Sequence, residues 1–243
     1  MSKLLALKLP GGRVLLYRLF ICPVTMRAMN EKSCPLCECT TISHYHQDKT
    51  RDYWQCAQCA LVFVAAEQHL GGEQEKAIYD QHENDLADVG YRRFLSRFSE
   101  PLHARLTYGS KGLDFGCGPA PMLATMLAEL GHNVALYDLY YYPDRQVLSG
   151  DYDFVSSTEV IEHLAQPQKA LRLWLDLLRP SGTLALMTKL VIDQQRFATW
   201  HYKNDPTHIA FYSKETFAYI AKRFGLDLEF IAADVIFLTK PAQ

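Results

Sequence analysis

The chain has 243 residues, of which 49% are hydrophobic and 21% are charged, and this balance is typical of a globular protein and not of a disordered one. The length accommodates one α/β domain of ordinary size with a short appendage. The formal net charge of -2 argues against a protein that grips nucleic acid over a wide basic face. Residues 1–60 nevertheless carry eight basic side chains against four acidic ones, which suits either an acidic partner or a solvated surface.

Residues 1–28 are predicted to be a leader outside the main fold. Their apolar stretch is interrupted by Arg13 and Arg18, so it is too short and too charged to span a bilayer and is a poor secretory signal. Met26 and Met29 are alternative starts of translation. We therefore expect a cytoplasmic protein with no membrane association. Its seven cysteines would then stay reduced, as metal ligands or core residues.

Two C-x-x-C pairs with 18 residues between them predict a zinc-ribbon-like module over residues 29–66. The pairs are formed by Cys34, Cys37, Cys56 and Cys59. Two such pairs complete a closed tetrahedral site, so the zinc would be structural and have no open position for chemistry. Segments 53–54 and 61–64 are expected to be ribbon strands that need the metal to fold. The nearby alternatives break the paired pattern: Cys39, His44 and His46.

Residues 67–90 are predicted to be a linker and residues 91–243 the main domain. In the main domain, apolar strand patterns alternate with helical ones. The expected strands are 113–115, 133–138, 153–157 and 182–188, and the expected helices are 91–108, 122–130, 158–162, 171–178 and one that Ser213 caps. A hairpin of residues 226–232 and 235–240 follows. This order predicts a doubly wound, mostly parallel sheet with helices on both faces.

The turn after the first of these strands predicts a cofactor site. Gly116 and Gly118 permit a tight turn and a close approach of ligand to backbone. A dinucleotide is disfavoured, because Pro119 and Pro121 lack the N–H groups that a pyrophosphate needs. Asp114 instead suits the cationic amino-acid end of a sulfonium cofactor. Asp138 ends the second strand 20 residues after Gly118, a separation at which an acid can bind ribose hydroxyls.

These motifs, with Tyr152–Val155 and Leu178–Leu184, resemble those of class I S-adenosylmethionine-dependent methyltransferases over roughly residues 75–240. The resemblance implies a Rossmann-like, seven-stranded sheet with an inserted antiparallel strand. It also places Asp114, Gly116, Cys117 and Gly118 at the methionine moiety of the cofactor and Asp138 at the ribose. The usual third strand would be short or missing, because only about a dozen residues precede Asp153. Tyr140, Tyr141 and Tyr142 either stack on the adenine or fill the edge of the core.

Glu159, Glu162 and His163 are spaced i, i+3 and i+4, which on a helix places them on one face beside the cofactor. Such a set can bind a divalent cation. The segment resembles the Glu-x-x-Glu-His helix of metal-dependent O-methyltransferases that act on ubiquinone catechols and on the 3′ ends of small RNAs. His208 is in a position comparable to the later histidine of the RNA enzymes. Two alternatives remain open, namely a metal-free His163 that acts as general base and a purely structural role.

The predicted function is methylation of a small-molecule hydroxyl or phenol, in which Mg or Mn lowers the pKa of the acceptor oxygen. Glu162 and His163 are the predicted catalytic residues, and His201 and Tyr202 are expected to line the substrate pocket. Two other functions compete with this one. The chain could be an RNA methyltransferase that uses the ribbon as RNA anchor, or a non-catalytic cofactor-binding partner subunit.

Overall fold

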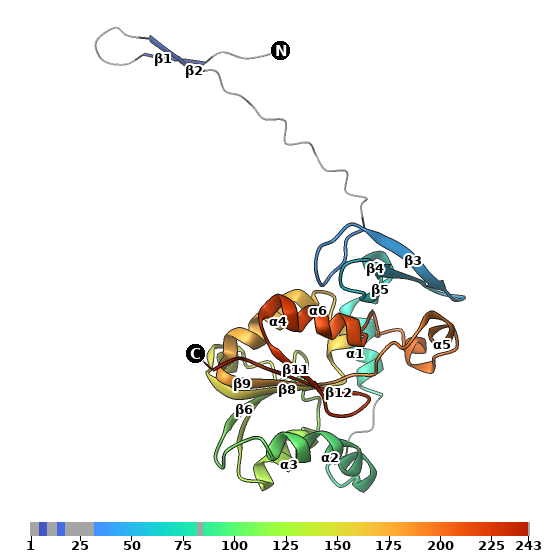
Figure 1. Cartoon of the computed structure of the whole chain (residues 1–243), viewed down its shortest axis with the longest axis vertical. Helices are drawn as coiled ribbons and strands as arrows, with labels where there is room; N and C mark the ends of the chain where they lie inside the picture. Colours follow the sequence, from blue (N-terminus) through green and yellow to red (C-terminus); the bar gives the residue numbers. More distant parts are fainter. Residues whose placement is uncertain (1–4, 9–13, 18–31, 82–84, 243) are drawn as a thin grey trace. The chain divides into compact units, whose positions relative to one another are not determined.

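A computed structural model describes residues 5–8, 14–17, 32–81 and 85–242 (Figure 1). The chain forms two compact units, Met1–Glu31 and Lys32–Gln243. In the first unit, strands β1 (Leu5–Lys8) and β2 (Val14–Tyr17) pair as an antiparallel hairpin. The rest of the predicted leader lies outside the described residues. None of the helices in the described parts of the chain is both long and apolar enough to cross a bilayer.

The second unit is built on a six-stranded sheet of order β11-β12-β9-β8-β6-β7. Its strands are β6 (Lys111–Phe115), β7 (Asn133–Tyr137), β8 (Tyr152–Thr158), β9 (Leu178–Met187), β11 (Asp227–Phe230) and β12 (Val235–Thr239). The pairs β6–β7, β6–β8 and β8–β9 are parallel, whereas β12 is antiparallel to both β9 and β11. This arrangement confirms the predicted mostly parallel sheet with an inserted antiparallel strand.

The implied seventh strand is absent from the part of the chain that the structure describes. The segment between β7 and β8 contains the short 3₁₀ helix η2 (Arg145–Ser149) instead. A parallel crossover alone takes a dozen or more residues, so this segment is too short for another strand and two crossovers.

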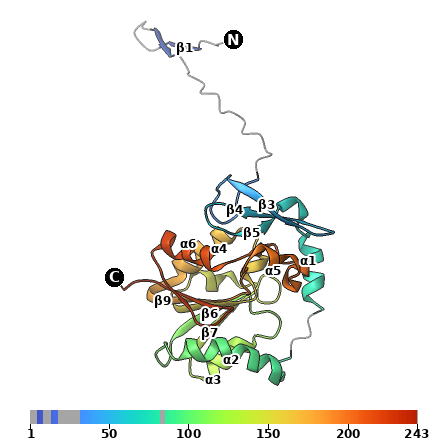
Figure 2. The ribbon, with the colours of Figure 1, turned by 45° about the vertical axis from the view of Figure 1, so that its right-hand side comes forward.

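Helices cover both faces of the sheet (Figures 1 and 2). On one face, α2 (Val89–His103) and α3 (Met122–Glu129) bury Leu95, Phe98 and Leu127 against β8 and β12. On the other face lie α4 (Pro167–Leu177) and α6 (Lys214–Phe224). Ser213 accepts a hydrogen bond from Thr216 N and so caps α6 as predicted.

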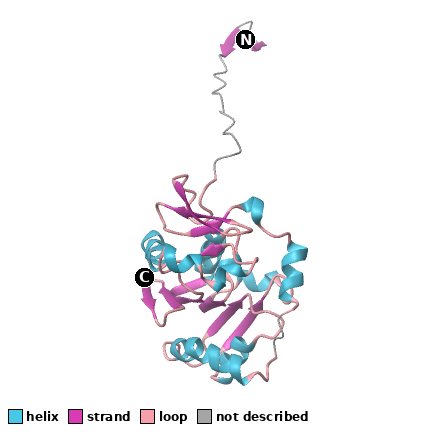
Figure 3. Cartoon of the chain, turned by 90° about the vertical axis from the view of Figure 1, so that its right-hand side faces the viewer, coloured by secondary structure: helices cyan, strands magenta, loops and turns pink. Residues whose placement is uncertain are grey.

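The stretch predicted as a linker contains two helical segments, η1 (Ala66–Gln68) and α1 (Gly72–Tyr79). Between β9 and α6 the chain forms two further short helices, α5 (Gln194–Ala198) and η4 (His201–Asn204). Figure 3 shows the helices of the chain on both sides of its sheets.

The cysteine module is part of a second sheet, of order β10-β5-β4-β3, with all pairs antiparallel. Its strands are β3 (Ile42–Gln47), β4 (Asp52–Cys56), β5 (Val62–Val64) and β10 (Ala210–Phe211). β4 and β5 confirm the predicted ribbon strands, whereas β3 and β10 were not predicted. Because β10 comes from the main domain, the module and that domain share one sheet. They also share a core, in which Cys59 and Leu61 belong to the same cluster as Tyr212.

The predicted helix over residues 158–162 is wrong. β8 continues to Thr158, and Glu159 then adopts a left-handed conformation with φ 53°. Only Ile161–His163 form a helical turn, the 3₁₀ helix η3. Glu159 N donates to Met187 O, so Glu159 still belongs to the end of the sheet and not to a helix with Glu162 and His163.

Candidate active site

The turn between β6 and α3 leaves open space beside its backbone. Gly116 and Gly118 both have positive φ, 79° and 65°, a conformation that glycine adopts without steric cost. A Cβ on Gly116 would lie 2.3 Å from Val160 Cγ2, whereas a Cβ on Gly118 would meet no atom within 4 Å. The turn therefore packs tightly on one side and faces a cavity on the other.

Asp114, one residue before the end of β6, is a buried carboxyl group with one hydrogen-bond donor among the described residues. Only 3% of the residue is exposed, and Ser156 Oγ donates to Asp114 Oδ1 at 3.1 Å. Burial raises the pKa of Asp114 to about 7, and the charge of Asp138 adds to this effect. In such an environment a nearby cation strongly stabilises the ionised form of the carboxyl group.

Asp138, directly after β7, is held by three backbone N–H groups. Oδ2 accepts from Gly118 N at 3.0 Å, and Oδ1 accepts from Tyr140 N at 2.9 Å and from Tyr141 N at 3.1 Å. The predicted partners Gly118 and Asp138 are thus in direct contact. Each oxygen of a carboxylate has two lone pairs, so Asp138 can still accept bonds from ligand hydroxyls.

A cavity of about 450 Å³ adjoins Asp138. Its walls include Leu139, Tyr140, Tyr141 and Leu164. The Tyr140 hydroxyl donates to Glu75 at 3.1 Å and the Tyr141 hydroxyl donates to Asp80 at 2.7 Å. Tyr142 is not part of this lining. Of the two predicted roles for the tyrosines, Tyr140 and Tyr141 thus have the geometry of a ligand wall.

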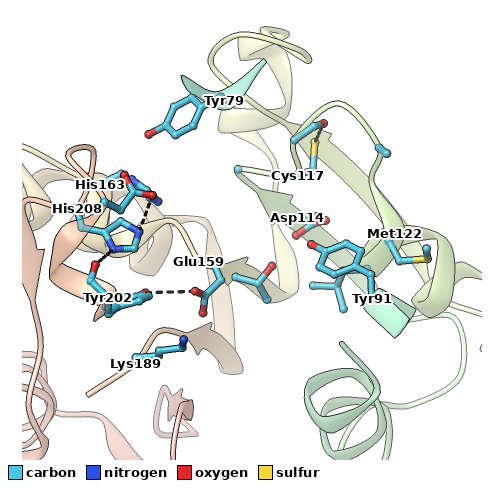
Figure 4. A pocket seen from close by; sticks show the side chains of 16 residues that line it. Tyr79, Tyr91, Asp114, Cys117, Met122, Glu159, His163, Lys189, Tyr202 and His208 are labelled. Carbon is cyan, nitrogen blue, oxygen red and sulfur yellow. Dashed lines mark hydrogen bonds and ion pairs between the residues drawn. The ribbon is translucent and has the colours of Figure 1, made fainter. Parts of the chain in front are cut away.

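A second cavity, of about 400 Å³, shares Tyr79, Gly116, Gly118, Glu159 and His163 with the first. Figure 4 shows that two walls face each other across it. One wall carries Asp114, Cys117, Met122 and Tyr91, and the other carries His163, His208, Tyr202 and Lys189. The glycine turn and the predicted Glu–His segment therefore meet at one cavity.

Glu162, His163 and His208 each offer one ligand atom, and these atoms lie within 4.8 Å of one another. His163 Nδ1 donates to Thr207 O at 3.1 Å, and His208 Nδ1 donates to Tyr202 O at 2.7 Å. In both rings Nε2 is then the nitrogen with the lone pair. A carbonyl that orients the other nitrogen is the usual arrangement of a metal-binding histidine.

The electrostatics of the cluster also favour a cation. Burial raises the pKa of Glu162 to about 7, and burial together with the charge of Glu162 raises that of Glu159 to about 8. Burial and the neighbouring His163 lower the pKa of His208 to about 4. Glu159 Oε1 and Glu162 Oε2 are buried without a hydrogen-bond partner among the described residues, and such groups are costly unless a ligand satisfies them.

The structure changes two of the sequence-based assignments. Glu159 is not in the group with Glu162, His163 and His208, because its left-handed bend separates it from the η3 turn. The Tyr202 hydroxyl nevertheless bonds to both Glu159 and Glu162. His201 is exposed and lines neither of the two cavities. Tyr202, its neighbour, lines the second cavity, and its role in substrate binding stays a prediction.

The four predicted zinc cysteines are close together. The Sγ atoms of Cys34 and Cys59 are 3.4 Å apart, as are those of Cys37 and Cys56, and all four lie within 4.8 Å of one another. A tetrahedral site with Zn–S bonds of about 2.3 Å requires sulfurs about 3.8 Å apart, so the tetrad fits zinc with small adjustments. The alternatives Cys39, His44 and His46 are not members of the group.

Several residues of the second cavity were not predicted: Tyr79, Tyr91, Lys189 and Asp205. Tyr79 lies inside the stretch predicted as a linker and Tyr91 directly follows it, and nothing in their local pattern marks them. Asp205 stands three residues before His208 in Asp205-Pro206-Thr207-His208, and this proximity is the one available signal.

A doubly wound sheet with a glycine turn after its first strand and an acid at the end of the next defines the class of nucleoside-cofactor enzymes to which methyltransferases belong. Residues 82–229 match the family model described as a methyltransferase domain. The chain belongs to this family and is an S-adenosylmethionine-dependent methyltransferase. No curated protein matches its sequence.

Solved structures that resemble the chain include three methyltransferases. The 1,6-didemethyltoxoflavin-N1-methyltransferase of Burkholderia thailandensis is 16% identical, with 82% of this chain and 99% of that chain covered and a TM-score of 0.46. An O-methyltransferase family protein from Burkholderia thailandensis is 14% identical (70% and 63% covered, TM-score 0.46). Human N-acetylserotonin methyltransferase is 13% identical (63% and 54% covered, TM-score 0.46). Similarities at this level bear on neither substrate nor partner.

Proposed function

We propose that the protein methylates a hydroxyl or phenol oxygen of a small molecule with the help of a divalent cation, Mg or Mn. One observation carries this proposal. The glycine turn beside Asp114 lines the same cavity of about 400 Å³ as His163 and His208, whose ligand atoms lie within 4.8 Å of the buried Glu162. A methyl donor on one wall and an acceptor held at the other would therefore meet inside this cavity.

The residues of the first wall suit S-adenosylmethionine. Asp114 offers its buried carboxylate to the cationic amino-acid end, and the turn at Gly116 and Gly118 leaves room for close approach. Asp138 has lone pairs for the ribose hydroxyls, and Tyr140 and Tyr141 line the adjoining cavity where the adenine would lie. The bound cofactor supplies the electrophilic methyl group.

Glu162, His163 and His208 are the proposed ligands of the cation, which when bound lowers the pKa of the acceptor hydroxyl. Both histidines are oriented for this by carbonyl acceptors at Nδ1. Glu159 lines the cavity, and its Oε1 has no partner among the described residues. Because its pKa is raised to about 8, it can accept the proton of the acceptor only in its ionised form, which a bound cation would favour. If no cation binds, His163 is the candidate general base.

Cys34, Cys37, Cys56 and Cys59 are proposed to hold a structural zinc. Three of them are buried, and they share a core with α6 and Tyr212. Basic residues where the module meets the main domain are also buried: Arg51 and Lys203 are 8% and 5% exposed. Because an RNA anchor needs exposed basic side chains, these features favour a structural module over the RNA-methyltransferase alternative.

The test is transfer of labelled methyl groups to cell extract fractionated into metabolites and RNA, with and without added Mn or Mg. We expect label in the metabolite fraction, dependence on the cation, and loss of transfer by at least about a hundredfold in Glu162→Gln, with cofactor binding retained in calorimetry. Label in RNA would instead favour the RNA enzyme. Cofactor binding without any transfer would favour the partner subunit. Transfer that resists EDTA would exclude the cation and leave His163 as base.

A further inference from the structure

The segment that carries Tyr202 and His208 has little regular structure of its own. Between η4 and β10 the chain runs through residues 205–209 without a helix or strand. Such a segment usually has low local stability, yet it carries two side chains of one wall of the cavity, Tyr202 and His208. The hydrogen bonds that its backbone carbonyls accept therefore decide how firmly the segment is held in place.

Arg51, the residue directly before β4 in the cysteine module, donates hydrogen bonds to these carbonyls. Its guanidinium donates to Pro206 O at 3.1 Å, to His208 O at 3.0 Å and to Asp205 O at 3.0 Å, and it also bonds to Lys203 O. The five N–H groups of an arginine form a rigid fork, and only 8% of Arg51 is exposed. One side chain thus satisfies four carbonyls within six residues of backbone.

Other residues of the module also form hydrogen bonds with the segment that carries Tyr202 and His208. The Tyr53 hydroxyl donates to Asp48 at 2.7 Å and to Lys203 O at 3.3 Å. Val64 N donates to Ile209 O at 2.9 Å, where β5 begins to pair with β10. The module therefore holds the segment by hydrogen bonds both at its beginning and at its end.

The same segment touches the η3 turn that carries the other two proposed ligands. Ile209 N donates to Glu162 O at 2.9 Å, and the Tyr212 hydroxyl donates to Ile161 O at 3.2 Å. His163 Nδ1 donates to Thr207 O. A continuous set of hydrogen bonds thus leads from Arg51 to Glu162, His163 and His208.

We infer that Arg51 is a positioning residue for the active site, and that the cysteine module serves catalysis by clamping residues 203–209 so that Glu162, His163 and His208 converge. This inference rests on the proposed function for the identity of the site. The clamp itself is a claim about the backbone and can be measured without any cation.

The experiment compares Arg51→Met and Arg51→Lys with Arg92→Met in the zinc-loaded full chain saturated with S-adenosylmethionine. Arg92 pairs with Glu129 on the surface, so its variant controls for the loss of an arginine. In Arg51→Met we expect amide hydrogen exchange across residues 203–209 to be at least about tenfold faster, because four buried carbonyls lose their donor. Arg51→Lys, which keeps the charge without the fork, should be intermediate, and Arg92→Met should match the wild type.

Titration with Mn²⁺ gives the second readout. Affinity for Mn²⁺ should fall about tenfold or more in Arg51→Met while affinity for S-adenosylmethionine stays within about twofold. Unchanged exchange in residues 203–209 of Arg51→Met would overturn the clamp. Faster exchange with unchanged Mn²⁺ affinity would overturn its role in positioning. If the wild type binds no Mn²⁺ at this site, the proposed metal fails, and the exchange data still decide on the clamp.

If Arg51→Met unfolds the module as a whole, exchange in β3 and β4 becomes faster as well. Tyr53→Phe then decides, because it removes one hydroxyl, whose proton is shared between Asp48 and Lys203 O, and leaves the fork in place. We expect a rise in exchange of a few-fold confined to residues 203–209. A rise spread evenly over the chain, or none, would overturn the clamp.

Discussion

Gly118 and Gly225 have the same φ of 65° but different surroundings. A Cβ on either would meet no atom within 4 Å, but only Gly118 lines the two cavities, whereas Gly225 ends α6. Alanine in this conformation costs about 1 kcal/mol. We therefore expect Gly118→Ala and Gly225→Ala to lower stability by the same amount, and only Gly118→Ala to weaken cofactor binding, by at least about tenfold.

Thermal unfolding and calorimetry with S-adenosylmethionine measure the two effects separately. Equal cofactor affinity in both variants would mean that the open space beside Gly118 is not where the cofactor lies. Gly116→Ala is not a suitable probe, because its Cβ would lie 2.3 Å from Val160 and would disturb folding as well.

The raised pKa of Asp114 makes both stability and binding depend on pH. Its ordinary pKa is 3.8, and burial raises it to about 7, so the folded protein holds a proton that the unfolded chain has lost between these values. Stability of the cofactor-free protein should thus fall as the pH rises from about 4 to 7. The cofactor, being cationic at this end, requires the ionised form. Its affinity should fall about tenfold per pH unit below pH 7.

Asp114→Asn provides the control for this pH dependence. The amide cannot ionise, so cofactor affinity should be weak and nearly independent of pH between 5 and 7. Over the same pH range, the stability of Asp114→Asn should depend less steeply on pH than that of the wild type, because the asparagine takes up no proton. A wild-type affinity that is flat over this range would contradict the assignment of Asp114 to the cationic end of the cofactor.

At the scale of helices and strands, the sequence predicts those features that a pattern of neighbouring residues encodes. The glycine turn, the acid after β7 and the strand and helix alternation follow from the periodicity of neighbouring residues. The helix expected at residues 158–162 fails because three well-spaced side chains do not specify a helix when the strand before them ends in a left-handed residue. β10 has two residues, and its partner β5 lies about 150 positions earlier, so no local signal marks it.

The proposed zinc at the cysteine tetrad would stabilise the strands of the module. Cys37→Ser should reduce bound zinc and lower the melting temperature by about 10 °C or more, because loss of a structural zinc costs several kcal/mol. Cys39→Ser is the matched control: Cys39 is in the same loop but outside the tetrad, and its sulfur contacts only Thr41 among the described hydrogen bonds. Zinc released by a thiol reagent and thermal unfolding measure both effects.

If Cys39→Ser lowered the zinc content as much as Cys37→Ser, the ligand set would have to be revised to include Cys39. If neither variant changed the zinc content, the four cysteines would be core residues with free thiols that bind no metal.

At the scale of the whole molecule, the site is assembled from segments that are far apart in the chain. Tyr79, Asp114 and His163 come from α1, β6 and η3, and His208 comes from the loop before β10, yet all four line one cavity. The types and spacing of residues could suggest His208 only through the resemblance to known enzymes. The contribution of Arg51 could not be foreseen, because its partners are backbone carbonyls about 155 positions away and carbonyls carry no sequence signature.

This assembly predicts that the protein has two metal dependences of different kinds. A brief treatment with EDTA should remove the cation from the three-ligand site, which is open to the cavity, and added Mn²⁺ should restore full activity. The closed zinc site should keep its ion under these conditions. Stronger chelation that strips the zinc should also abolish activity, but Mn²⁺ alone should not restore it, because residues 203–209 lose the module that holds them.

Zinc content, Mn²⁺ affinity and methyl transfer, measured on the same samples, separate these cases. Zinc added before Mn²⁺ should return the activity, whereas the reverse order should be slower, since the cation site forms only after the module has refolded. Zinc-free protein that regains full activity with Mn²⁺ alone would show that the active site converges without the module. The module would then have to serve another purpose, and the segment around His208 would need a different source of order.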